Sequence, residues 1–209
     1  NTLFGYDTGT AISTGDNNTL LGYDAGKAIT SSSENVIIGS SAGSGANQST
    51  ASKNVIMGHQ AVQNQDNPNE IVAIGYRAMG NSKDDASGNV AIGAYCLEHQ
   101  TPTQEVFNIT AIGAYAGQKT QSGFGQSVLV GKSAGQYINN ADFTTAIGFL
   151  SLRGTSTGPL YGYRNTGCGY RTLTSLITTG EKNTALGSEA GDALTTGKTN
   201  TCIGYNAQA

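Results

Sequence analysis

Hydrophobic and polar positions repeat along this chain in a short unit that starts on a polar residue and ends on glycine. The clearest copy is Asn183-Thr184-Ala185-Leu186-Gly187, in which Asn precedes a β-branched residue, two apolar residues and Gly. Twelve such units recur, and their final glycines, called here the anchor glycines, are 17 to 21 residues apart. The anchor glycines are Gly5, Gly22, Gly39, Gly58, Gly75, Gly93, Gly113, Gly131, Gly148, Gly169, Gly187 and Gly204. A repeat this short and regular is typical of a solenoid, in which each copy forms one coil.

Three positions before each anchor glycine predict a short β-strand. The first, called here the Thr/Val column, is Thr or Val in every copy, which is the β-branched preference of strands. The last, the pre-glycine column, is apolar in every copy. Because side chains alternate along a strand, these two columns share one face and the middle column between them faces the other way. We interpret the Thr/Val and pre-glycine columns as the coil interior, which leaves the middle column outside.

The middle column contains no charged or polar side chain, which is unexpected for a face that meets water. Soluble monomers rarely expose a long apolar stripe, and identical chains wound around a common axis would cover it. The sequence therefore predicts a homo-oligomer, for which the resemblance given below implies three chains. The predicted interface consists of Leu3, Leu20, Ile37, Ile56, Ala73, Ala91, Ala111, Leu129, Ala146 and Ala185.

Two further positions predict the corners of the coil. The anchor glycine suits a corner that requires positive φ or the absence of a Cβ atom. The residue three after it is small, as at Ala25 and Ala190, which indicates close approach of neighbouring backbone. Asn stands four residues before the anchor in eight of the twelve copies, and stacked Asn side chains at a turn can hydrogen-bond neighbouring backbone.

Composition excludes several classes of protein. Charged residues make up 12% of the chain, and the 11 Lys and Arg residues are scattered, so no nucleic-acid partner is expected. The chain has no run of about 18 apolar residues, so the sequence does not predict membrane insertion. The three cysteines occupy repeat positions and are interpreted as small buried hydrophobes. We interpret residues 1–209 as a single repeat domain, part of a longer fibre chain, with longer insertions near 97–107 and 153–164.

Candidate catalytic chemistry is sparse. Asp7 and Asp24 occupy equivalent positions in adjacent copies, but the copies that follow have no carboxylate there. His59 and His99 have no metal ligands at suitable spacing. We therefore expect no enzyme activity, no metal and no cofactor.

Aromatic residues are the candidates for a binding role at the predicted surface. Several Tyr residues follow an anchor glycine directly, and we interpret them as a ladder across the coils. The longest insertion is the candidate receptor-contact loop, because function tends to lie on loops of a rigid scaffold. Its candidate contacts are Leu160, Tyr161, Tyr163 and Arg164.

The repeat resembles known fibre proteins. Asn89-Val90-Ala91-Ile92-Gly93 and Asn183-Thr184-Ala185-Leu186-Gly187 resemble repeats in the heads of trimeric autotransporter adhesins. Asn18 to Gly26 and the turn Thr195-Thr196-Gly197 are similar to the longer repeats of phage tail fibres. The intervals here are longer than those of the adhesin heads, which favours the phage fibre. The resemblance covers the whole chain and implies a homotrimer of parallel β-rolls or β-prisms on a virion or cell surface.

These observations together predict an all-β, left-handed parallel β-solenoid of about 12 coils, assembled as a homotrimer. The expected function is a rigid structural segment of a phage tail fibre or similar receptor-binding appendage, located in the virion. Expected partners are the chain itself, other fibre or virion proteins, and a host-surface glycan or protein. The alternatives are a bacterial trimeric adhesin head at the cell surface and a glycan-cleaving tailspike. Ice binding through the Thr/Val column ranks last, because that column is expected to be buried.

Overall fold

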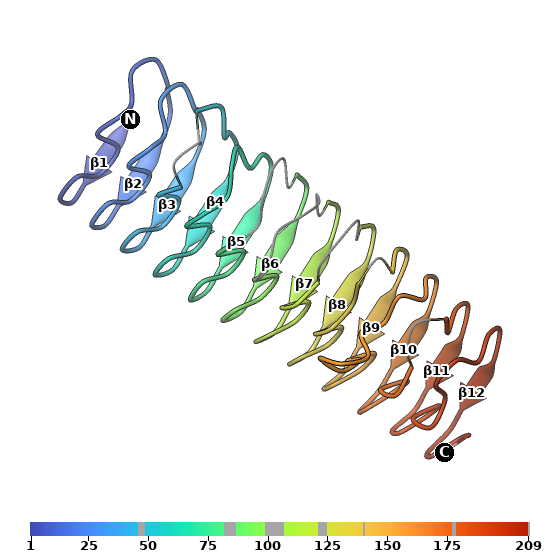
Figure 1. The fold of residues 1–209 in the computed structure, drawn as a ribbon. Coiled ribbons are helices and arrows are strands. Elements are labelled where there is room, and N and C mark those ends of the chain that lie inside the picture. The colour runs from blue at the N-terminus through green and yellow to red at the C-terminus, as the bar shows by residue number, and fades with distance from the viewer. Residues whose placement is uncertain are drawn as a thin grey trace.

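The chain forms a parallel β-solenoid of twelve short strands, which follow one another along a rod (Figure 1). The computed structural model describes residues 1–45, 49–81, 87–98, 107–120, 125–139, 141–176 and 179–208, and contains no helix in these ranges. The strands are β1 (Thr2–Phe4), β2 (Thr19–Leu21), β3 (Val36–Ile38), β4 (Val55–Met57), β5 (Val72–Ile74), β6 (Val90–Ile92), β7 (Thr110–Ile112), β8 (Val128–Val130), β9 (Thr145–Ile147), β10 (Thr166–Cys168), β11 (Thr184–Leu186) and β12 (Thr201–Ile203). The predicted all-β parallel solenoid is confirmed, whereas its handedness stays a prediction.

The strands pair in sequence order and in register. Val55 pairs with Val72, Ile56 with Ala73 and Met57 with Ile74, and the same register recurs between all neighbouring strands. Each column of the sequence repeat is therefore a row of stacked side chains along the rod. At roughly 4.8 Å per strand, the sheet is on the order of 50 Å long.

The two faces of the sheet are the reverse of the predicted assignment. The middle column points into the coil and is buried from β2 to β12. The Thr/Val and pre-glycine columns point outward, and no residue in them is fully buried. Thr184 and Leu186 are exposed, Leu186 by 50%, while Ala185 between them is buried. The prediction that the middle column lies on the outside of the coil is therefore wrong.

This reversal removes the surface on which the predicted trimer interface depended. Nine of its ten residues are enclosed within their own chain and offer no surface to a neighbour. They are Leu20, Ile37, Ile56, Ala73, Ala91, Ala111, Leu129, Ala146 and Ala185. The tenth, Leu3, also belongs to the inward column but is 42% exposed, because β1 has a strand on one side only.

The physical reason for the reversal is the way the narrow interior is filled. The residue four positions after the anchor glycine is also buried from Gly9 to Gly191, and in eight of the twelve coils either this residue or the middle-column residue is large while the other is Gly or Ala. Leu129 is accompanied by Gly135, whereas Ala146 is accompanied by the buried Leu152. A Cβ atom at Gly135 would lie 2.7 Å from a methyl group of Leu129. In these coils one large side chain from either position fills the interior and leaves no room for the pre-glycine residue. Gly117 and Gly191, which accompany Ala111 and Ala185, lie against Leu side chains of neighbouring coils instead.

The anchor glycines lie at a corner where successive coils touch. Their φ angles run from 120° to 141°, a region that L side chains rarely adopt. A Cβ atom at Gly58 would lie 2.3 Å from the carbonyl oxygen of Gly75 in the next coil. Both the dihedral angle and the close backbone contact therefore require glycine here.

A ladder of buried Asn side chains runs alongside the inward column. The side-chain oxygen of Asn18 accepts hydrogen bonds from the backbone N–H of Asn35 at 3.1 Å and from its side-chain amide at 3.0 Å. The amide of Asn18 donates to the carbonyl oxygen of Ser32 at 2.8 Å. Asn183 makes equivalent contacts near the other end of the rod. Each Asn thus satisfies buried polar groups of its own coil and of the next.

Candidate functional site

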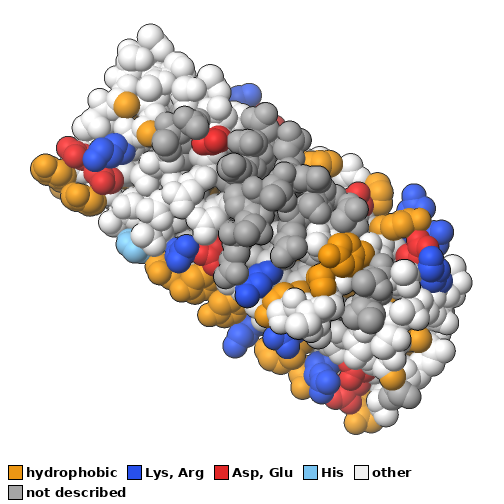
Figure 2. Space-filling view, viewed as in Figure 1, with side chains coloured by type: hydrophobic (Ala, Val, Ile, Leu, Met, Phe, Trp, Pro, Cys, Tyr) orange, Lys and Arg blue, Asp and Glu red, His pale blue; other side chains and the backbone are white. Residues whose placement is uncertain are grey.

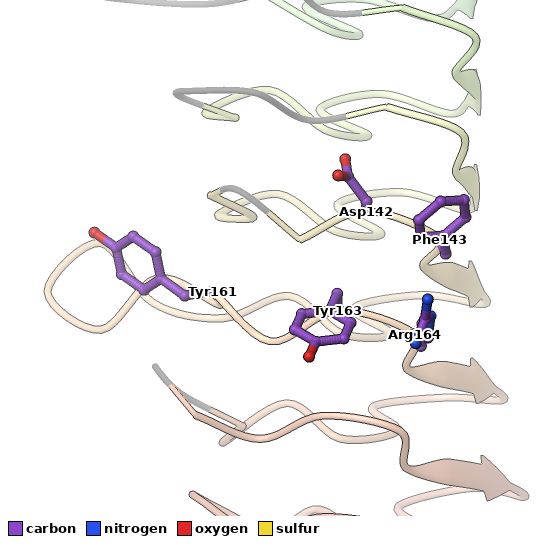
Figure 3. A pocket seen from close by; sticks show the side chains of 5 residues that line it. All are labelled: Asp142, Phe143, Tyr161, Tyr163 and Arg164. Atoms are coloured by element: carbon purple, nitrogen blue, oxygen red, sulfur yellow. The ribbon is translucent and has the colours of Figure 1, made fainter.

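A hollow lies between the coils of β9 and β10, in and beside the insertion at 153–164. It has a volume of about 450 Å³ and is lined by Asp142, Phe143, Tyr161, Tyr163 and Arg164. Figure 3 shows Tyr161 on the projecting loop, Tyr163 and Arg164 on the segment that leads into β10, and Asp142 and Phe143 on the coil above. Three aromatic rings and two charged groups of opposite sign therefore meet at one place.

Backbone packing explains why the two tyrosines project. Gly162 is buried between them, and a Cβ atom there would lie 1.5 Å from the carbonyl oxygen of Gly180. Only glycine fits against the next coil, so the alternating residues Tyr161 and Tyr163 face outward, 40% and 41% exposed. Leu160 is the inward anchor of the loop: it is buried, and its backbone N–H donates to the carbonyl oxygen of Tyr137 at 3.0 Å.

This placement corrects one predicted receptor contact. Leu160 is 1% exposed and cannot touch a receptor in this conformation. Tyr161, Tyr163 and Arg164 are exposed and line the hollow. The other predicted insertion, near 97–107, lies mostly outside the residues that the structure describes.

Arg164 is held beside aromatic rings. Its guanidinium carbon lies 5.6 Å from the ring centroid of Phe143 and 5.4 Å from that of Tyr163. Lys182 adds a second cation 5.8 Å from the Tyr163 ring. A hydrogen bond to Glu181 and the negative charge of that residue raise the pKa of Tyr163 above its ordinary value. The contacts with the rings orient the cations without neutralising them.

Asp142 is held in place by hydrogen bonds with two backbone N–H groups. One of its carboxylate oxygens, Oδ1, accepts a hydrogen bond from the backbone N–H of Gly125 at 2.8 Å, and its carbonyl oxygen accepts from the N–H of Arg164 at 3.0 Å. Sequence reasoning missed both Asp142 and Phe143. The signal was present, because they stand six and five residues before Gly148, as Tyr163 and Arg164 stand before Gly169.

The other candidates of the sequence are engaged in structural contacts. Asp7 and Asp24 both pair with Lys27, at 3.2 and 3.1 Å. His59 stacks on Tyr76, with ring centroids 5.6 Å apart. His99 lies outside the described residues. Within the parts of the chain that are described, no group of three or more His, Cys, Asp or Glu side chains could hold a metal ion.

Five of the ten exposed aromatic residues that the structure describes form ladders between coils. Parallel stacks join Tyr6 to Tyr23, Tyr95 to Tyr115 and Phe149 to Tyr170, with centroids 5.3 to 5.8 Å apart. Each stack covers one face of each ring, and Tyr6 remains 68% exposed. Among the described residues, Tyr161 has neither a stacked ring nor a cation over its own ring. Phe4 and Tyr205 share this property but do not line the hollow.

A second candidate surface is the outer face of the sheet, which combines the Thr/Val and pre-glycine columns. Phe4, Leu21, Met57, Ile112, Val128, Ile147, Leu186 and Ile203 are its most exposed large apolar residues. This face is distinct from the edge formed by the loops that follow the strands, where Figure 2 shows hydrophobic side chains interspersed with charged ones. The outer face carries no charged side chain in any of its twelve strands.

Comparisons of the chain with protein-family models, curated proteins and solved structures find no match. The described residues also include no helix that is long and apolar enough to cross a membrane.

Proposed function

We propose that this chain is a rigid segment of a phage tail fibre or a similar receptor-binding appendage, and that it assembles as a homotrimer. The observation that carries the proposal is the outer face of the sheet. A face of Thr, Val and larger apolar residues, repeated over twelve strands without a charge, is unusual for a surface that meets water.

The identity of the covering partner follows from the repetition of this face. A rod whose coils all present the same apolar columns is best covered by a rod of equal length and equal spacing. Copies of the same chain around a common axis meet this requirement, because each coil then contacts the corresponding coil of its neighbours. The trimer first expected from the middle column is thus proposed again, on the opposite face.

A mechanical role suits the rest of the molecule. Parallel strands in strict register, buried Asn ladders and interlocking corners tie each coil to the next. Stability in such an array is close to a sum of neighbouring contacts, so it does not depend on a single core. The result is a stiff spacer that can carry a recognition loop at its side.

The alternatives have less support. A bacterial adhesin head would share the architecture, and the residues of this chain do not distinguish it from a fibre. A glycan-cleaving tailspike would require two carboxyl groups across one groove, whereas Asp142 is the one carboxylate in the described lining of the hollow. The outward direction of the Thr/Val column supports ice binding. The pre-glycine column on the same face varies from Phe4 to Cys168, however, so this face offers no regular lattice.

Light scattering on the purified chain tests the proposal, which expects three copies per particle. Asp substitutions at Ile112 and Ile147, both about two-fifths exposed on the outer face, should give monomers with an unchanged β-sheet circular dichroism spectrum. Thr155→Asp, on the exposed insertion, is the matched control and should remain trimeric. A wild-type monomer that stays soluble at high concentration would contradict the proposal.

A further inference from the structure

We infer that the hollow between the coils of β9 and β10 is a saccharide subsite for a pyranose that bears a carboxylate. This inference rests on the proposed function, since the subsite would supply the surface contact of the appendage. It starts from the difference between Tyr161 and the laddered aromatic residues.

The first step is the exposed ring surface. Tyr161 is 40% exposed, has no ring partner among the described residues, and stands on the wall of a hollow of about 450 Å³. Hollows of roughly 300–1,000 Å³ with aromatic walls and a few polar groups are the usual form of small-molecule sites. An aromatic ring offers a rigid apolar surface at low entropic cost, which suits the C–H face of a sugar ring.

The second step is the polar groups. Arg164 has no carboxylate within 4.0 Å among the described residues, so its guanidinium is available for a two-point hydrogen bond with an anionic ligand group. The carboxylate of Asp142 is turned toward the preceding coil, where it accepts from the N–H of Gly125, and it leaves Arg164 as the charged group that faces a ligand (Figure 3). One ligand must therefore offer an anion and an apolar face.

The third step is the local charge. Arg164 and Lys182 bring two cations to the Tyr163 ring, while the carboxylate of Glu181 pairs with Lys198 and holds the Tyr163 hydroxyl. Cations therefore exceed available carboxylates here, which favours an acidic sugar over a neutral one. A simple carboxylate would use Arg164 but leave the Tyr161 ring without a partner.

Saturation-transfer NMR on the intact chain tests the inference with methyl β-D-glucuronide, methyl β-D-glucoside and N-acetylglutamate as probes. We expect transfer to the ring protons of the glucuronide, and an affinity about tenfold weaker for each of the other two probes. Tyr161→Ala and Arg164→Ala should each weaken glucuronide binding by about tenfold or more, while Tyr161→Phe, which keeps the ring, should retain it. Tyr23→Ala, in a laddered stack at the far end of the rod, is the matched control and should bind as wild type.

Three outcomes would overturn the inference. They are no glucuronide binding by the folded wild type, binding that is unchanged by both alanine substitutions, or equal binding of the glucoside or of N-acetylglutamate. Light scattering on the same samples separates this inference from the proposed function. If the chain is a trimer that does not bind glucuronide, the subsite is contradicted and the proposed trimer stands. If the chain is a monomer that binds glucuronide, the trimer is contradicted and the subsite stands.

Discussion

The two faces of the sheet both lack charge, yet they perform different tasks. In most coils the inward face varies in a compensated manner: where the middle column is large, as at Leu129, the opposing turn residue is Gly135, and where it is small, as at Ala146, the turn supplies Leu152. The outward face shows no such compensation, and its residues change size from coil to coil without a partner. A closed interior has a fixed volume, whereas an open face tolerates variation.

The comparison shows that apolarity alone does not identify the buried side of a strand. What distinguishes the inner face is complementarity with residues elsewhere in the same coil. What distinguishes the outer face is that its residues remain exposed in the single chain. The outer face therefore calls for a partner, and each experiment below changes one face while leaving the other intact.

The largest expected effect comes from neighbouring residues that point in opposite directions. Ile56→Asp would bury a carboxylate without a partner inside the coil and should cost about 4 kcal/mol or more, enough to unfold the chain. Met57→Asp, one residue further on the outer face, should change monomer stability by about 1 kcal/mol at most. Met57→Asp should nevertheless prevent assembly. Urea unfolding and light scattering on both variants measure these outcomes, and equal stability of the two would refute the assignment of faces.

The second prediction transplants the core of one coil into the next. Ala146→Leu alone should overpack the coil of β9 and cost about 1–3 kcal/mol. Leu152→Gly alone should leave a cavity of similar or greater cost, partly offset because Leu152 has φ of 48°, which glycine adopts readily. The double variant reproduces the Leu129/Gly135 pair of the preceding coil.

A double-mutant cycle measures whether the two positions share one space. We expect a coupling free energy of about 1–3 kcal/mol that favours the double variant. Ile147→Val, on the outer face, combined with Leu152→Gly serves as the control and should show additive effects. Additivity in the Ala146/Leu152 pair would mean that these residues do not fill a common interior.

Much of this fold was predictable from the sequence, since the anchor glycines and the Thr/Val column already predict the strands, their number and their parallel order. The orientation of the faces was predictable too, from signals other than hydrophobicity. The Asn position and the middle column are two residues apart, so they share a face. A stacked Asn ladder needs a buried position, which places the middle column inside as well.

The site was harder to predict, because it depends on contacts between coils. Tyr161, Tyr163 and Arg164 are visible in the insertion, but the same reasoning selected Leu160, which points inward. The inward direction of Leu160 depends on the close contact of Gly162 with Gly180 in the next coil. That contact depends on the spacing between neighbouring coils, which the local sequence pattern does not specify.

A smaller effect is expected from the Asn ladder. Asn183→Ala removes a side chain whose amide donates to the carbonyl oxygen of Gly197 and whose oxygen accepts from the backbone of Asn200. The loss should be about 2 kcal/mol, because buried polar groups in two coils are left without partners. Thr184→Ala, the adjacent outward residue, should cost about 0.5 kcal/mol or less. Thermal unfolding of both variants measures the difference, and a smaller loss for Asn183→Ala than for Thr184→Ala would contradict the ladder.

The prediction with the smallest expected effect concerns how fast iodoacetamide modifies the three cysteines of the chain. Cys202 belongs to the inward column, Cys96 is buried, and Cys168 lies half-exposed in the pre-glycine column of the outer face. Burial raises the pKa of Cys96 to about 12, so almost no reactive thiolate forms at pH 8. The pKa of Cys202 is raised for the same reason. In the folded monomeric Met57→Asp variant, iodoacetamide should therefore modify Cys168 much faster than Cys96 or Cys202. In the proposed trimer Cys168 should be protected as well, and full modification of Cys168 in wild-type particles would place the contact between chains elsewhere.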